Sequence, residues 1–498
     1  MIRKQTPSRS NLRVIDGSQD AGKAFVRPLM LPDAPDLGAQ ELAAEMAEIF
    51  AMSLIAECHL SDLDNPHCVV QIDPATRFNL HELLCELRSL PWCDARTPAK
   101  DLGDLPATDD MDEAGHRRAA RWNIESQLTL GTLFRSGVAL TSGAAPLSGL
   151  FATDHAVGPA QGPLPAPVSA APLSLWSRWC AVHSGAGLGL PGRGASNADI
   201  TTLSELAEHV FKAPPARAFH SATLASLAHG SPFDPGLNGL TGKAEGWTGG
   251  RLFALLAEAE SRARWAALRR LARADRLSRP AVTAARMTVH LAREEQQSDA
   301  AEARYRGAAD ELARSAPNLL NWVSRANKAA RSRQRFEHSL FLPLGTAAET
   351  MHPSDTATHV VVAGALATLM KAVFDTSQPR HLRLASKADA RMDLGQELDR
   401  LVANTALARV VTGAYFPAEN HQDMRLGQAI ALQVLRTAME EDNRSASLTF
   451  RDFDGRILQL VSHPRQFGRG IAELRQGDVS LPWPQEATPP AAHLTAVV

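Results

Sequence analysis

The sequence predicts an all-α fold made of helical bundles, with one small β-hairpin near the C-terminus. Three observations support this prediction. Apolar residues recur at helical spacing along most of the 498-residue chain. Ala, Leu and Arg are abundant and aromatic residues make up only 5% of the sequence, a composition that suits helices. Segments 447–451 and 456–461 alternate around Asp454-Gly455, which is a strong hairpin signal.

The predicted helices follow from apolar stripes and from their start and stop signals. Asp36 can cap a first helix over 36–57. Pro280 is well placed to open another helix, because proline fits the first helical position. The remaining helices are expected at 79–90, 113–135, 201–229, 250–277, 281–297, 300–334, 356–376, 393–414 and 420–441.

The chain divides into an arm, one large helical domain and a tail. Residues 1–36 are rich in Pro, Ser and Asp and are predicted to be an irregular N-terminal arm. A single helical domain is predicted over 37–465, since no internal repeat divides it. Within this domain, 136–200 is a long loop region rich in Pro and Gly, and 201–461 is the bundle that carries the site. Residues 466–498 are predicted to be a C-terminal tail.

Composition excludes several classes of partner. The formal net charge is -2, from 52 basic and 54 acidic residues, so nothing electrostatic favours nucleic acid or an anionic membrane. The start of the chain lacks an apolar signal segment, and the longest apolar run, 360–370, is too short to span a bilayer. A cytoplasmic location is therefore expected. Five cysteines, an odd number, are expected to be free thiols.

A short set of polar residues carries the functional prediction. His359 follows a turn that begins at His352 and runs directly into an apolar helix. Upstream, Arg279 precedes a proline at the junction of two predicted helices. Downstream, Arg409 lies in an apolar stretch and is followed six residues later by Tyr415, one of only two tyrosines. An arginine in an apolar stretch needs an anionic or carbonyl partner, which favours a polar pocket here.

The order of these residues resembles that of the vanadium-dependent haloperoxidases, which share their site with the type 2 phosphatidic acid phosphatases. The resemblance is specific over 201–461 and weaker over 37–60. It implies an all-α fold of that type. Several separate pieces match in the right order: 230–236, 279–280, 352–359, 362–365, 404–409, 426–431 and 453–455.

Three functional residues of that family are retained. In the family, a vanadate ion is held by a Lys, two Arg, a Ser side chain and a Gly backbone amide, and it is bonded to one His. A second His acts as the acid–base catalyst. By this resemblance the two arginines correspond to Arg279 and Arg409, and the acid–base histidine corresponds to His359.

The other four positions have changed. The Lys position is Leu271 or Ala272, the Ser-Gly pair is Ala357-Thr358, and the metal-bonded His is Tyr415. Vanadate is a multiply charged oxyanion that needs dense cationic surroundings when it leaves water, and a phenol is a poorer neutral ligand than imidazole. We therefore expect vanadate to be absent or weakly bound, with no other cofactor. The residues expected to line the altered pocket are Leu271, Ala357, Thr358 and His352.

What remains is suited to proton transfer on a carbonyl compound. The resemblance extends to homologues that have lost vanadate and that rearrange α-hydroxyketones in bacterial meroterpenoid pathways. It implies a cofactor-independent isomerase that shifts a prenyl group on an aromatic ketol. The implied roles are general base for His359, oxyanion stabilisation for Arg279 and Arg409, and proton donation to the ketone for Tyr415.

Two other functions stay open. One is a chloro- or bromoperoxidase with altered vanadate coordination, in which a neighbouring arginine such as Arg270 replaces the Lys only if its helix is rotated. The other is a non-catalytic partner of an active paralogue, in which Tyr415 only fills space and His359 is an ordinary core histidine. A homodimer or larger homo-oligomer is expected by analogy with the fold, with an exposed helix at 37–57 as a contact.

Overall fold

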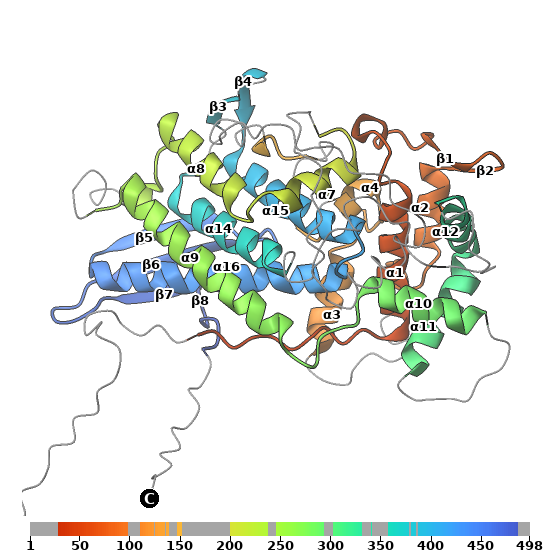
Figure 1. Cartoon of the computed structure of the whole chain (residues 1–498). Helices are drawn as coiled ribbons and strands as arrows, with labels where there is room; N and C mark the ends of the chain where they lie inside the picture. Colours follow the sequence, from red (N-terminus) through yellow and green to blue (C-terminus); the bar gives the residue numbers. More distant parts are fainter. Residues whose placement is uncertain are drawn as a thin grey trace, which may run out of the picture.

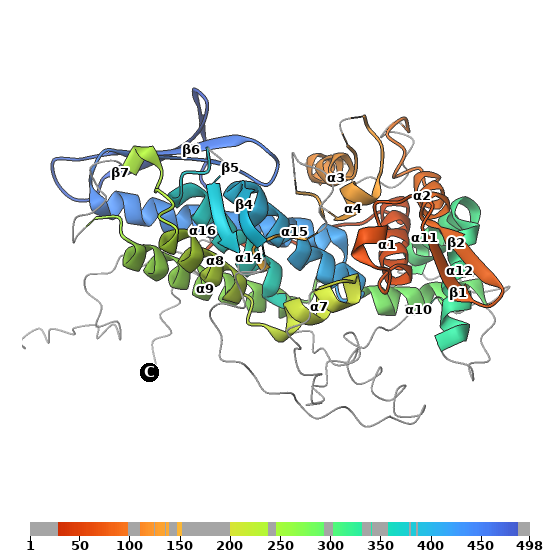
Figure 2. The same ribbon diagram turned by 90° about the horizontal axis from the view of Figure 1, so that it is seen from above.

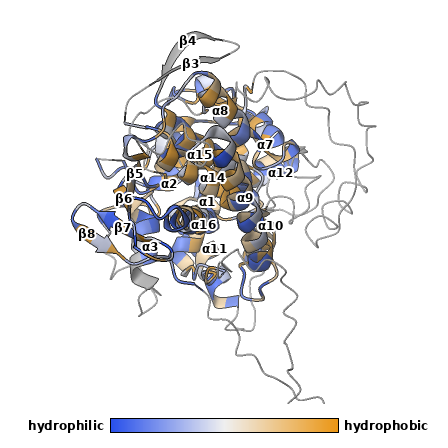
Figure 3. Ribbon diagram, turned by 90° about the vertical axis from the view of Figure 1, so that its left-hand side faces the viewer, coloured by the Kyte–Doolittle hydropathy of each residue, from blue (hydrophilic) through white to orange (hydrophobic). Residues whose placement is uncertain are grey.

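The structure is built around one helix, α14 (His359–Val373), whose residues are all buried. This computed structural model shows α9, α15 and α16 packed against α14 (Figure 1). Apolar residues concentrate on these central helices (Figure 3). The predicted all-α fold with a small C-terminal β-structure is confirmed. The structure describes residues 28–97, 110–123, 125–134, 136–138, 147–151, 200–237, 246–292, 302–330, 340, 357–377, 380–384 and 387–486.

The described helices lie within or close to the predicted segments, and most of them are shorter than predicted. None of them combines the length and apolar character that a bilayer-spanning helix requires. The other α-helices are α1 (Ala39–Leu54), α2 (Leu80–Arg88), α3 (Asp110–Ala119), α4 (Leu130–Phe134), α7 (Leu203–Lys212), α8 (Arg217–Ala228), α9 (Gly249–Leu271), α10 (Pro280–Leu291), α11 (Ala303–Ser315), α12 (Pro317–Ala330), α15 (Leu394–Val411) and α16 (Pro417–Asp442). Two short 3₁₀ helices lie at Leu60–Asp62 and Pro235–Leu237.

Three predicted helices are each two helices in the structure. The segment 201–229 breaks between α7 and α8 at a pair of prolines, and 300–334 breaks before Pro317, because proline removes a backbone donor and clashes with the preceding turn. The segment 113–135 breaks after α3, where the Asn123 side chain accepts hydrogen bonds from two backbone amides of a turn. The helix predicted over 250–277 ends earlier, at Leu271.

The predicted hairpin is confirmed and is part of a larger sheet. Strand β5 (Ala446–Arg451) pairs antiparallel with β6 (Ile457–His463) around the turn that contains Gly455. Strands β7 (Ile471–Gln476) and β8 (Val479–Leu481) extend the sheet. The prediction of a C-terminal tail over 466–498 is therefore wrong where β7 and β8 lie, because these strands belong to the sheet. The sheet packs against α14 and α16 (Figure 2).

Two smaller hairpins lie away from this sheet. Strand β1 (Val69–Asp73) pairs with β2 (Thr76–Asn79) directly before α2. Strand β3 (Arg380–Leu384) pairs with β4 (Lys387–Met392) between α14 and α15. Neither hairpin was expected from the sequence, because their short strands lie beside stronger helical patterns. Most of the predicted loop region 136–200 lies outside the described residues.

Helices α14 and α16 cross with their backbones in contact. A Cβ atom added at Gly364 would lie 2.5 Å from the carbonyl oxygen of Met424, and one added at Gly427 would overlap the carbonyl oxygen of Val361. Only glycine fits at these two positions, because any side chain would push the helices apart. The crossing fixes the first turns of α16 relative to α14.

Helix α1 is buried and is not the exposed contact predicted at 37–57. Its face toward α3 carries three glutamates, which pair with two arginines. Arg117 donates from Nε and Nη2 to Glu41 at 2.8 and 3.0 Å. Arg121 pairs with Glu45, and its Nε lies 3.4 Å from Glu48. Burial raises the pKa of Glu48 to about 7, although Arg121 opposes the shift.

The raised pKa of Glu48 predicts a pH-dependent stability. The folded state holds this proton more tightly than the unfolded chain, so the stabilisation is present below about pH 4.5 and is lost as pH rises toward about 7. The free energy of unfolding of the wild type should fall by about 3 kcal/mol more than that of Glu48→Gln as pH rises from 4.5 to 8, measured by urea unfolding. The control is Glu258→Gln, whose carboxylate is exposed on α9. Identical pH profiles for the Glu48 variant and the wild type would contradict this explanation.

Candidate functional site

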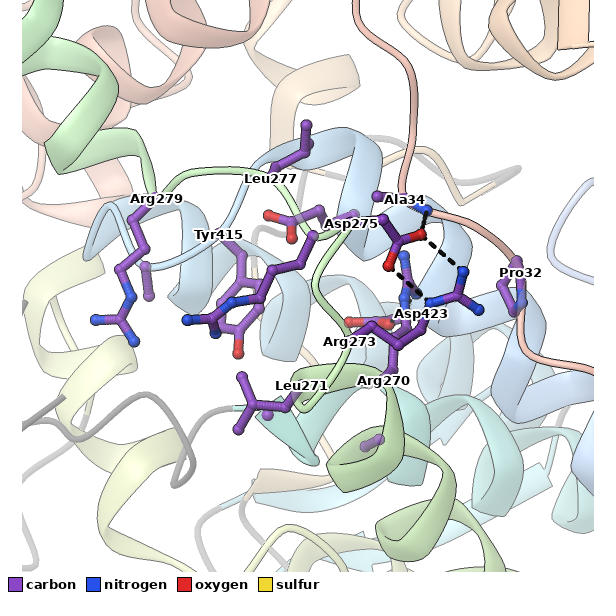
Figure 4. A pocket seen from close by; sticks show the side chains of 15 residues that line it. Pro32, Ala34, Arg270, Leu271, Arg273, Asp275, Leu277, Arg279, Tyr415 and Asp423 are labelled. Carbon is purple, nitrogen blue, oxygen red and sulfur yellow. Dashed lines mark hydrogen bonds and ion pairs between the residues drawn. The ribbon is translucent and has the colours of Figure 1, made fainter. Parts of the chain in front are cut away.

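A cavity of about 50 Å³ lies where the end of α9, the start of α14 and the junction of α15 with α16 meet (Figure 4). The loop between α9 and α10 and the arm residues Pro32 and Ala34 form its remaining walls. Four of the predicted site residues line this cavity. They are Leu271, Arg279, Ala357 and Tyr415. Six further lining residues are charged and were not predicted as site residues: Arg270, Arg273, Asp275, Arg276, Glu419 and Asp423.

Tyr415 reaches the cavity because α15 ends before this residue and the backbone turns back at Gly413. Helix α15 stops at Val411, and Gly413 adopts a positive φ of 61°. The amide of Ala414 then donates to the carbonyl oxygen of Arg409 at 3.0 Å, which closes the helix end. The helix predicted over 393–414 therefore ends earlier, at Val411, and the chain turns Tyr415 toward the cavity.

Arg409 lies behind Tyr415 and is fully buried. Its guanidinium carbon is 3.5 Å from the centroid of the Tyr415 ring, and its exposed fraction is 0%. Its Nη1 donates to Asp423 Oδ2 at 2.7 Å. Its Nε and Nη2 have no hydrogen-bond partner among the described residues. Buried donors of this kind are costly, so they indicate a place for an acceptor oxygen.

Asp423 connects Arg409 to a second arginine, Arg270. The Nη1 of Arg270 lies 2.5 Å from Asp423 Oδ1, and its Nη2 donates to Gln422. Because α9 ends at Leu271, the side chain of Arg270 reaches the cavity without the helix rotation that the sequence had suggested. Arg270 therefore lines the cavity together with Arg273, Arg276 and Arg279, at a position other than the one where the resemblance places a Lys.

Burial sets the protonation of the remaining side chains. Burial raises the pKa of Tyr415, and the charge of Arg409 offsets only part of that effect, so the phenol keeps its proton. Burial also raises the pKa of Glu419 to about 7, although the amide of Phe416 donates to its carboxylate at 3.0 Å. Burial lowers the pKa of Arg279. Glu419 was missed because its place in the first turn of α16 has the pattern of a helix cap.

Three described residues of the predicted site do not line the cavity: Arg409, Thr358 and His359. His359 is the first residue of α14, is 4% exposed, and packs edge-on against Phe211 with ring centroids 5.3 Å apart. It is not among the residues that line the cavity, although Ala357, two residues earlier, is. Thr358 is buried and forms no side-chain cap on α14. His352 lies outside the described residues.

The described residues do not fit a vanadate ion. Four lining arginines supply positive charge, but Asp423 already accepts from Arg270 and from Arg409 behind Tyr415, and Asp275 and Glu419 add two further acids. At the position of the metal-bonded histidine stands a protonated phenol, whose ring covers Arg409. A multiply charged oxyanion would meet a carboxylate inside its own cradle. Nor do the described residues contain a group of three or more His, Cys, Asp or Glu able to hold a metal ion.

Comparison with known proteins supports the fold. No family model matches the chain. Vanadium-dependent bromoperoxidases of Corallina pilulifera and Corallina officinalis are each 25% identical over 485 residues, with 87% of this chain and 76% of the relative covered. The homohexameric vanadate-dependent bromoperoxidase AnII of Ascophyllum nodosum superposes with a TM-score of 0.58 and 14% identity, over 91% of this chain and 75% of that one.

The chain thus has the fold of the vanadate-dependent bromoperoxidase AnII. In sequence it is similar to the two Corallina bromoperoxidases over most of its length. The similarity supports the resemblance found in the sequence. The similarity also supports an enzymatic activity for this chain, because the relatives are enzymes.

The two tyrosines give a direct test of the environment of Tyr415. Burial raises the pKa of Tyr305 too, but Ser278 and two arginines outweigh it, so that pKa is lowered. We expect the phenolate absorbance of the folded protein to rise in two separate steps with pH. Tyr415→Phe should remove the higher step and Tyr305→Phe the lower one. A Tyr415 that ionises before Tyr305 would contradict the described burial.

Proposed function

We propose that this protein is a cofactor-independent isomerase of the haloperoxidase fold, which rearranges an α-hydroxyketone. One observation carries the proposal. Where the resemblance places a metal-bonded histidine, Tyr415 holds its proton against the buried guanidinium of Arg409. Arg279 and Glu419 line the same cavity. A proton donor, cations and a carboxyl group that titrates near neutral pH are the groups that such a rearrangement needs.

The rearrangement balances without a cofactor. A base removes the hydroxyl proton of the substrate. The migrating prenyl group moves with its bonding electron pair from the carbinol carbon to the adjacent carbonyl carbon. The carbinol carbon becomes the new ketone, and the former carbonyl oxygen takes up the negative charge and then the proton of Tyr415. The base returns its proton to the phenolate, so substrate and product have the same composition.

Two residues are candidates for the base. The resemblance assigns His359, which is buried at the start of α14. The geometry favours Glu419, because it lines the cavity and its pKa of about 7 suits a general base at neutral pH. Either residue can act as the base in the proposed rearrangement, and the pH profiles of their variants, described below, distinguish the two.

The surroundings of the cavity support a substrate with a polar head and an apolar tail. The cavity itself has room for the hydroxyketone group only. A larger groove of about 390 Å³ lies on the other side of Pro32, which lines both spaces. Its walls include Leu29, Leu31, Leu426 and Ala429. We propose that a prenyl chain lies there, on an aromatic substrate of a bacterial meroterpenoid pathway.

A haloperoxidase with altered coordination is the second candidate function. Arg270 supplies the third cation that the sequence appeared to lack, and the bromoperoxidases match over most of the chain. Metal analysis after incubation with orthovanadate, together with a bromination assay, separates this candidate from the isomerase. A non-catalytic partner of an active paralogue is the third candidate, and turnover by the isolated chain would exclude it.

We propose a cytoplasmic homo-oligomer as the state of the protein. The Ascophyllum bromoperoxidase of similar fold is a homohexamer. Because α1 is buried within the chain, a contact between copies has to use another surface. Light scattering of the purified protein should give a mass that is a multiple of 53.5 kDa. A mass of one chain at micromolar concentration would exclude the oligomer.

The proposed roles predict a graded set of activities. Tyr415→Phe should lower kcat for an α-hydroxyketone by about 100-fold or more, the range expected when a general acid is lost. If Glu419 is the base, kcat rises as pH increases through about 7, and Glu419→Gln removes that rise. If His359 is the base, His359→Ala has that effect instead.

The matched control is Arg269→Ala. Arg269 is adjacent to Arg270 but packs on Trp265 at the exposed side of α9, 4.7 Å from its ring centroid. We expect wild-type kcat and KM for this variant. Undiminished turnover in both Tyr415→Phe and the two base variants would count against the proposed function.

A further inference from the structure

We infer that Asp423 is the residue that lowers the affinity of this cavity for multiply charged tetrahedral oxyanions. This exclusion concerns the protein alone and does not depend on turnover.

The position of the Asp423 carboxylate is the first step. Asp423 is 5% exposed, and its two oxygens each meet one arginine, Arg270 at 2.5 Å and Arg409 at 2.7 Å. Each guanidinium therefore already donates from one terminal nitrogen to the same carboxylate. A phosphate or vanadate that used those nitrogens would have to displace a group that belongs to the protein.

Charge repulsion is the second step. A dianion seated among these arginines would lie within about 4 Å of the carboxylate. At the effective dielectric of partly buried sites, two like unit charges at that separation change a binding constant by about 1,000-fold. Glu419 at the same cavity adds to the repulsion above about pH 7. Arg270 and Arg409 are thus compensated by a carboxylate of the protein before any ligand arrives.

The third step is that Asp423 cannot swing away. Its neighbour Met424 has its carbonyl oxygen 2.5 Å from the place of a Cβ at Gly364, and Gly427, one turn further along α16, is in backbone contact with α14. The turn that carries Asp423 is held between these contacts. The carboxylate is a fixed part of the cavity wall.

The exclusion can be measured by calorimetric titration with inorganic phosphate and with orthovanadate at pH 8. The wild type should bind neither in the micromolar range. Asp423→Asn keeps the shape of the side chain and removes its charge, so its affinity for both probes should rise by at least 100-fold. The control is Glu440→Gln, which removes the same charge from α16 but acts on a pair with Arg436 away from the cavity.

A second variant keeps the test possible if Asp423→Asn does not fold. Asp423→Ala purified with formate should fold, because formate can take the place of the missing carboxylate between the two arginines. It should bind phosphate once formate is removed, and added formate should compete with phosphate.

Four results would overturn the inference. These are tight binding by the wild type, an equal gain in the Glu440 control, no gain in either Asp423 variant, and no competition by formate. Absence of isomerase turnover in a wild type that still excludes phosphate would refute the proposed function alone.

Discussion

The site depends on the backbone contact between α14 and α16. At Gly364 and Gly427 the two helices approach so closely that neither has room for a Cβ atom. Interiors are packed as densely as organic crystals, so such a crossing leaves no freedom to rotate one helix against the other. The first turns of α16, which carry Glu419 and Asp423, are therefore set in a fixed relation to the start of α14, where Ala357 lines the cavity.

Charge compensation in the cavity follows from that constraint. A buried ion pair stabilises a protein only when its geometry is good, because removal of two charges from water costs several kcal/mol per ion. Asp423 meets this condition twice, once with Arg270 and once with Arg409. The cavity consequently keeps strong hydrogen-bond donors, while part of the positive charge around it is compensated within the protein. Such surroundings favour polarisation of a carbonyl group over retention of an inorganic dianion.

Local signals in the sequence predicted more of this arrangement than long-range ones could. The positive φ of Gly413 is a local property, so the helix end and the inward turn of Tyr415 could be predicted. The pair formed by Arg270 and Asp423 joins residues 153 positions apart, and a single sequence contains no signal for such a pair. Glu419 has the sequence pattern of a helix cap and is one, and only the fold shows that it also lines a cavity.

The polar network extends beyond the cavity and would make the proposed loss of vanadate binding hard to reverse. From Asp423 it passes through Arg270 to Gln422, whose amide donates to Glu113 at 2.8 Å. Each buried charge in it has a partner of opposite sign, so removal of one partner leaves another unpaired at a cost of several kcal/mol. Tyr415→His alone would restore an imidazole where the related enzymes bond their metal. The carboxylate of Asp423 would still lie between two of the arginines, and an oxyanion would still be repelled.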